Sequence, residues 1–159
     1  MLTREEFIRT AGQQMDAIFR LAFSCLKSRT DADDVTQTVL LRLYERQRPF
    51  ESDDHLRHWL IRVTLNECKR YWRSPWRRTE DFDSYAGTLT FEVPRDGELF
   101  EAVMALDGKY RVVIWLYYYE GYTIAEIARL LHLPGGTVGT RLKRARERLR
   151  GMLSEEAER

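Results

Sequence analysis

The sequence predicts an all-α protein built from two small helical domains that a flexible linker joins. Its composition favours helices, since only 9 of 159 residues are Gly and 4 are Pro, while 43% are apolar. Apolar residues recur at spacings of three and four in several segments, as they do along the buried stripe of a helix. Residues 75–95 show neither helical nor alternating periodicity, and a stretch of that length indicates a domain boundary. We therefore expect domains at residues 1–74 and 96–159.

Three helices are predicted in the first domain, over about residues 5–26, 30–46 and 54–73. Thr30 followed by Asp33 predicts a capping box at the start of the second helix. A loop that contains a proline then leads to the third helix, for which Ser52 is the predicted cap. The aromatic content of the third helix suits packing against the first two.

The second domain is predicted to begin with two helices, over about residues 99–106 and 110–120. Gly121 is predicted to end the second of them. Thr123 and Glu126 then form a capping box that opens a short helix. The predicted buried face of this short helix is Ile124, Ile127, Ala128 and Leu131.

A tight turn over residues 133–136 follows and leads into the last helix. A short capped helix, a tight turn and a longer helix together predict a helix-turn-helix. The apolar stripe of the last helix is Val138, Leu142, Ala145 and Leu149.

Charge is segregated along the chain although the formal net charge is only +1. Residues 62–78 and 139–150 are basic, whereas residues 79–101 are acidic. A basic face on the second helix of a helix-turn-helix suits entry into the major groove of DNA. The candidates to contact base edges or phosphates there are Thr137, Thr140, Arg141 and Arg144. A solvated basic face on a terminal helix is the plainer interpretation, but the capped helix and the turn favour DNA binding.

Aromatic and basic residues alternate along the first basic segment, from Trp59 to Arg78. Aromatic rings stack on bases and basic side chains follow phosphates, so this segment could hold an unpaired strand. Some of these aromatics must instead belong to the core, and Trp59 is expected to be at least half buried.

The sequence does not favour a metal site, a disulfide bond or a catalytic centre. The acidic clusters at residues 31–34 and 51–54 stand where helices begin, and carboxylates are stabilised there without a metal. Cys25 and Cys68 lie on apolar faces and are expected to be buried thiols. With no nucleophile or phosphate loop evident, we expect no enzyme, no cofactor, no metal and no small-molecule substrate. The sequence has no signal-peptide pattern or long apolar run, so a cytoplasmic protein is expected.

The motifs resemble those of a known family, the extracytoplasmic-function (ECF) sigma factors, which are the short members of the sigma-70 family. Residues 31–44 resemble the family's segment that binds core RNA polymerase, and residues 59–66 its promoter-melting helix. Residues 122–128 and 133–138 resemble its C-terminal helix-turn-helix. These motifs occur in the family's order and span nearly the whole chain.

The resemblance implies that the first domain binds core polymerase and the −10 promoter element, and that the second binds the −35 element. The residues it places at core polymerase are Asp33, Asp34, Gln37, Leu40 and Leu41. Those near the −10 element are Phe50, Arg62, Asn66, Lys69, Arg70 and Arg73. Those near the −35 element are Thr123, Thr137, Thr140, Arg141, Lys143 and Arg144. The expected inhibitory partner is a membrane-associated anti-sigma factor.

Two alternatives remain open. A stand-alone helix-turn-helix regulator would account for the second domain but not the first. A metal-dependent enzyme that acts on DNA would use the acidic clusters, and magnesium-dependent cleavage by the pure protein would favour it.

Overall fold

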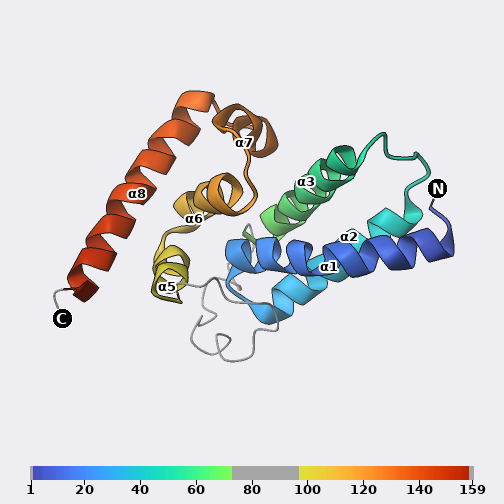
Figure 1. The fold of residues 1–159 in the computed structure, drawn as a ribbon, viewed down its shortest axis with the longest axis horizontal. Coiled ribbons are helices and arrows are strands. Elements are labelled where there is room, and N and C mark those ends of the chain that lie inside the picture. Colours follow the sequence, from blue (N-terminus) through green and yellow to red (C-terminus); the bar gives the residue numbers. More distant parts are fainter. Residues whose placement is uncertain (1, 73–96, 158–159) are drawn as a thin grey trace. The chain divides into compact units, whose positions relative to one another are not determined.

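The computed structural model describes residues 2–72 and 97–157, and these residues form only helices and connecting loops (Figure 1). The all-α prediction is therefore confirmed. The chain divides into two compact units, within residues 1–91 and 92–159. The predicted linker, residues 75–95, lies outside the described residues, as do Arg73 and Trp76.

The first unit contains helices α1 (Arg4–Leu26), α2 (Arg29–Glu45) and α3 (Asp53–Trp72), each of which packs against the other two. A capping box of Thr3 and Glu6 begins α1. The core between the helices is apolar, and its fully buried side chains include Leu21, Phe23, Val35, Leu43 and Leu65. Three helices of 17 to 23 residues thereby share one hydrophobic interior.

The predicted capping box of α2 is wrong. Ser28, which has an extended backbone, is the N-cap, and its hydroxyl accepts a hydrogen bond of 3.1 Å from the backbone N–H of Asp31. Lys27 has a left-handed backbone at φ 54° and ends α1, so the chain turns directly into α2. Thr30 therefore lies inside the first turn of α2 and cannot be its cap.

Ser52 caps α3 as predicted, since its hydroxyl accepts a hydrogen bond of 3.0 Å from the His55 N–H. Trp59 is 9% exposed, which confirms that it is at least half buried. The predicted burial of Cys25 and Cys68 is also confirmed. Burial and a hydrogen bond with Cys25 raise the pKa of the Cys68 thiol well above its ordinary value.

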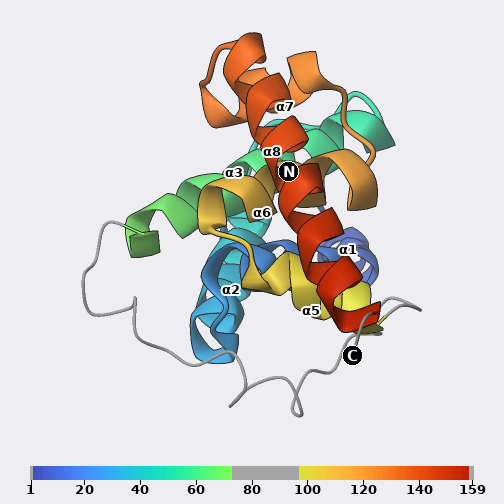
Figure 2. The ribbon, with the colours of Figure 1, turned by 90° about the vertical axis from the view of Figure 1, so that its left-hand side faces the viewer.

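The second unit contains α5 (Gly97–Ala105), α6 (Gly108–Ile114), a π-helical turn η2 (Trp115–Tyr119), α7 (Ile124–Leu131) and α8 (Gly135–Ala157). Helix α8 packs against α5, α6 and α7 (Figure 2). The single helix predicted over residues 110–120 is thus an α-helix that widens into a π-helical turn. Gly121 follows it at φ 75°, a backbone conformation that glycine adopts without strain.

The predicted capping box of α7 is confirmed: the Thr123 hydroxyl accepts from Glu126 N–H, and the Glu126 carboxylate accepts from Thr123 N–H, each at 3.1 Å. The predicted buried face is only partly right. Ile127 and Leu130 are buried, whereas Ile124 is 38% exposed. Ala128 and Leu131 are half-buried, whereas Leu130, which was not predicted to face inward, is buried on this helix that packs against α8.

The turn between α7 and α8 is shorter than predicted. His132 adopts a left-handed backbone at φ 56° and ends α7, while Gly135 and Gly136 already belong to α8. The carbonyl of Pro134 accepts from Val138 N–H at 3.2 Å, which brings this proline to the start of the helix. Three of the four predicted stripe residues are fully buried, namely Val138, Leu142 and Ala145. Across residues 2–72 and 97–157, no helix is both long and apolar enough to span a membrane.

Candidate polymerase and nucleic-acid interfaces

The predicted polymerase-binding residues share the outer side of α2. Asp33, Asp34 and Gln37 are exposed, Leu41 is 55% exposed, and Leu40 is half-buried. The opposite side of α2 faces the core with Val35, Val39 and Leu43. The helix therefore presents a small apolar area beside two carboxylates.

Tyr44 extends this apolar area by one turn of α2. Its side chain is 48% exposed, and its ring meets the edge of the Phe7 ring at a centroid distance of 5.2 Å. The apolar periodicity of the segment had suggested only that Tyr44 continues the helix. Its exposed, supported ring adds a rigid aromatic group to the surface.

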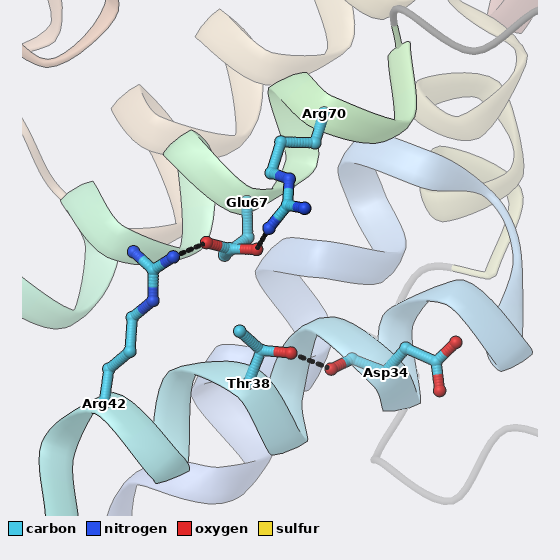
Figure 3. Close-up of polar contacts among 5 residues, drawn as sticks. All are labelled: Asp34, Thr38, Arg42, Glu67 and Arg70. Carbon is cyan, nitrogen blue, oxygen red and sulfur yellow. Dashed lines mark hydrogen bonds and ion pairs between the residues drawn. The ribbon is translucent and has the colours of Figure 1, made fainter. Parts of the chain in front are cut away.

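A buried carboxylate connects α2 to α3. Glu67 has a side chain only 5% exposed, and its two oxygens pair with Arg42 at 2.6 Å and with Arg70 at 3.2 Å (Figure 3). Glu67 was not predicted from the sequence as a site residue. The available signal was its position, because an acidic residue stood between Leu65 and Cys68 on the apolar stripe of α3.

The predicted −10 residues of α3 gather on one exposed face. Arg62 and Asn66 are exposed and Lys69 is half-buried, and their spacings of four and three place them in one row. Arg70 lies beside this row and is engaged by Glu67. Near it, burial and the carboxylates of Asp34 and Glu67 raise the pKa of the Tyr71 hydroxyl.

Phe50 belongs to an aromatic cluster at the start of α3. Its ring contacts those of His55 and Trp59 edge to face, at centroid distances of 5.3 and 5.5 Å. The Arg46 guanidinium lies 4.3 Å from the centre of the Phe50 ring. A pocket of about 440 Å³ opens beside this cluster, lined by Leu2, Glu6, Thr10, Arg46, Arg48, Pro49, Phe50, Ser52, Asp53 and Leu56.

A second pocket, of about 350 Å³, lies in the helix-turn-helix unit. It brings together four of the six predicted −35 residues, Thr137, Thr140, Arg141 and Arg144. Lys109 and Tyr110 of α6 complete its lining together with Gly136. The two α6 residues were not predicted from the sequence, because nothing in local periodicity indicates that α6 packs across α8.

The remaining predicted −35 residues lie outside this pocket. Thr123 serves as the cap of α7, and Lys143 is exposed on a different side of α8 from Arg144. Farther along α8, Arg146 Nε donates a hydrogen bond of 2.6 Å to the Tyr118 hydroxyl. Arg148 lies 4.5 Å from the centre of the Tyr110 ring. Four basic residues of α8 are thus divided between two roles: Arg141 and Arg144 line the open pocket, whereas Arg146 and Arg148 make contacts within the unit.

These features define a DNA-binding helix-turn-helix protein with a second helical unit suited to protein and nucleic-acid contacts. Residues 13–78 match the family model described as Sigma-70 region 2, and residues 96–149 match the one described as Sigma-70, region 4. The RNA polymerase sigma-E factor of Streptomyces coelicolor is 31% identical over 156 residues, covering 94% of this chain and 85% of that protein. The ECF RNA polymerase sigma factor SigW of Bacillus subtilis is 27% identical, covering 88% and 84%. The chain belongs to the sigma-70 family, as an ECF RNA polymerase sigma factor.

Solved structures agree with this assignment. The sigma factor RpoE, crystallised with the anti-sigma factor NepR from Bartonella quintana, has the same fold with a TM-score of 0.71 at 22% identity, over 94% of this chain and 98% of that one. CnrH, in complex with the cytosolic domain of CnrY, matches with a TM-score of 0.62 at 26% identity, over 96% and 90%. Because region 2 accounts for the first unit, a stand-alone helix-turn-helix regulator is excluded.

Proposed function

We propose that this sigma factor divides promoter recognition between its units: residues 1–74 bind core polymerase and the −10 element, and residues 96–159 bind the −35 element. The observation that carries the proposal is the pocket of the second unit. Residues from α6 and from successive turns of α8 converge there, and three of its side chains are cationic: Lys109, Arg141 and Arg144. Such a group matches the phosphate backbone at the mouth of a major groove.

Within the −35 contact, the N-terminal turns of α8 would enter the groove. Thr137 and Thr140 are short enough to approach base edges, while Arg141 and Arg144 reach a guanine or a phosphate. Lys109 projects from α6 and is proposed to hold the phosphate backbone on the pocket's other side. Thr123 is proposed to act through the start of α7, whose first turn its hydroxyl caps.

For the −10 contact, we assign strand tracking to the row of Arg62, Asn66 and Lys69 on α3. Arg73, which follows Lys69 by four residues in the sequence and lies outside the described residues, is proposed to take part as well. Trp59 is buried and is not proposed to stack on bases. Phe50 is the better candidate, because it is only half-buried and lines the 440 Å³ pocket. An unpaired base has both the apolar faces and the size to enter such a pocket.

Core polymerase is assigned to the outer side of α2, at Asp33, Asp34, Gln37, Leu40 and Leu41. An apolar area bordered by charge is typical of a protein interface. We also propose an anti-sigma partner that is membrane-associated, with the sigma factor acting in the cytoplasm. The exposed apolar side chains Leu41 and Tyr44, and the complexes in which RpoE and CnrH were solved, support this part.

The test is transcription in vitro from total genomic DNA of the source bacterium by core polymerase, with and without the protein. New transcript starts that share upstream −10 and −35 sequences are the expected result, and they define the promoter. Substitution Arg141→Ala should lower initiation at those starts without lowering core binding. The division proposed above is contradicted if −35 mutations in the DNA and Arg141→Ala leave initiation unchanged.

A further inference from the structure

Glu67 is a buried carboxylate of the first unit that lies between two arginines from two helices. Arg42 reaches it from α2 and Arg70 from one turn farther along α3, and the two guanidinium groups approach its carboxylate from opposite sides (Figure 3). The trio carries a net charge of +1, so one of the two cationic groups is neutralised.

The two ion pairs are not equivalent. The Arg42 pair is the shorter, with 2.6 Å between its Nη2 and the Glu67 Oε1, and it links two packed helices. The Arg42 side chain is 46% exposed. The Arg70 pair is 3.2 Å long, lies within one helix and has an arginine side chain 70% exposed. An exposed pair contributes little to stability, whereas a buried carboxylate stripped of every partner is costly. Breaking the Arg70–Glu67 pair should therefore cost little free energy as long as the Arg42–Glu67 pair remains.

This trio lies between the proposed polymerase-binding side of α2 and the proposed DNA-binding face of α3. Arg42 directly follows Leu41 of the outer side of α2. Arg70 directly follows Lys69, the last described residue of the exposed row on α3, and lies beside that row. A change in the Arg70 pair would thus occur where the proposed DNA face meets the proposed polymerase face.

We propose that Glu67 is a positioning residue that anchors Arg42 between α2 and α3 and withholds Arg70 until a DNA phosphate replaces the carboxylate. The inference rests on the proposed function, in which α3 follows the −10 strand. It predicts that Arg70 exchanges one anionic partner for another on binding, so its net contribution to DNA affinity is smaller than that of an unrestrained arginine. The Arg42–Glu67 pair stays in place and holds the helices together.

The experiment uses holoenzyme assembled from core polymerase and the full chain. The probe is a fluorescein-labelled duplex with a central unpaired dT bubble, whose dissociation constant is measured at low salt for wild type, Glu67→Gln, Arg70→Ala and the double variant. Glu67→Gln should tighten binding about threefold, the range that one exposed ion pair allows. Arg70→Ala should weaken binding about twofold in the wild-type background and at least about fivefold in the Glu67→Gln background.

Three controls separate this role from a structural one. Asp16→Asn removes one negative charge from the exposed side of α1 and should change affinity equally with or without Arg70. Glu67→Asp keeps the charge and should restore wild-type binding. If Glu67→Gln fails to fold by circular dichroism, Lys69→Ala provides the comparison in the wild-type background, where it should weaken binding more than Arg70→Ala does.

The inference is overturned if Glu67→Gln weakens binding, if it tightens binding whether or not Arg70 is present, or if Arg70→Ala costs as much as Lys69→Ala. The proposed function itself is contradicted if wild-type holoenzyme binds the bubble no better than core polymerase alone.

Discussion

Ser28 shows how a single side chain decides where a helix begins. It is buried, its hydroxyl accepts the Asp31 N–H, and Asp31 is itself buried in the first turn of α2. We predict that Ser28→Ala lowers the free energy of unfolding by about 1 kcal/mol, the usual cost of losing a capping hydroxyl. Thr30→Ala, two residues later and exposed, should change it by less than about 0.5 kcal/mol. Urea denaturation of both variants is the measurement, and equal effects would contradict the cap.

Two arginines of α8 should behave differently on DNA. Arg144 lines the 350 Å³ pocket, whereas Arg146 is bonded to the Tyr118 hydroxyl and lies 5.6 Å from the centre of that ring. On a duplex that carries the −35 element, Arg144→Ala should reduce the slope of log affinity against log salt by about one unit. Arg146→Ala should reduce it by less than half as much. Anisotropy titrations at four salt concentrations measure both, and an unchanged slope for Arg144→Ala would remove Arg144 from the phosphate contacts.

Single residues also mark the limit of prediction from sequence. Thr137, Thr140, Arg141 and Arg144 could be grouped beforehand, because helical spacing alone places them on one side of α8. Lys109 could not be added to them, since its place in the pocket depends on how α6 crosses α8. Glu67 was missed for the same reason: its partner Arg42 is 25 residues earlier in the sequence.

At the scale of elements, the two sides of α2 have different roles: the buried side packs in the core, and the outer side is proposed to contact polymerase. We predict that Asp34→Lys combined with Leu41→Ala weakens binding to core polymerase about tenfold while leaving helicity unchanged, because both side chains are exposed. Competition for core against the labelled wild-type chain measures the loss.

Helix α1 offers a matched control for this variant. Asp16→Lys combined with Met15→Ala makes the same kinds of change at exposed positions, Met15 being 44% exposed. It should bind core like the wild type. If the α2 and α1 variants lose affinity equally, the outer side of α2 is not the polymerase contact.

Elements could be predicted from sequence more completely than their ends and contacts. The capping box of Thr123 and Glu126 was readable because it depends only on neighbouring residues. The π-helical turn of η2 was not, because its Trp115–Tyr119 sequence has the same apolar pattern as an ordinary helix. Ile124 was misjudged because burial on so short a helix depends on where α8 crosses it.

At the scale of the whole molecule, each unit has its own apolar core. Leu65 lies in the core of the first unit and Leu142 in that of the second, and both are fully buried. Leu65→Ala and Leu142→Ala should each cost about 2–5 kcal/mol, but only in the unit that contains the change. Hydrogen exchange across the full-length chain should lose protection in α1–α3 for Leu65→Ala and in α5–α8 for Leu142→Ala. Loss of protection in both units from either change would show one cooperative structure instead of two.

The paired thiols of Cys25 and Cys68 give the protein a natural chemical reporter. They are the only cysteines in the sequence, and both are buried. A hydrogen bond between the two free thiols links α1 to α3. A thiol reagent can therefore modify only those molecules in which these two helices have separated, and the second unit contributes no signal. The modification rate in excess reagent would record how often the first unit opens, with and without core polymerase, in a chain that carries no added label.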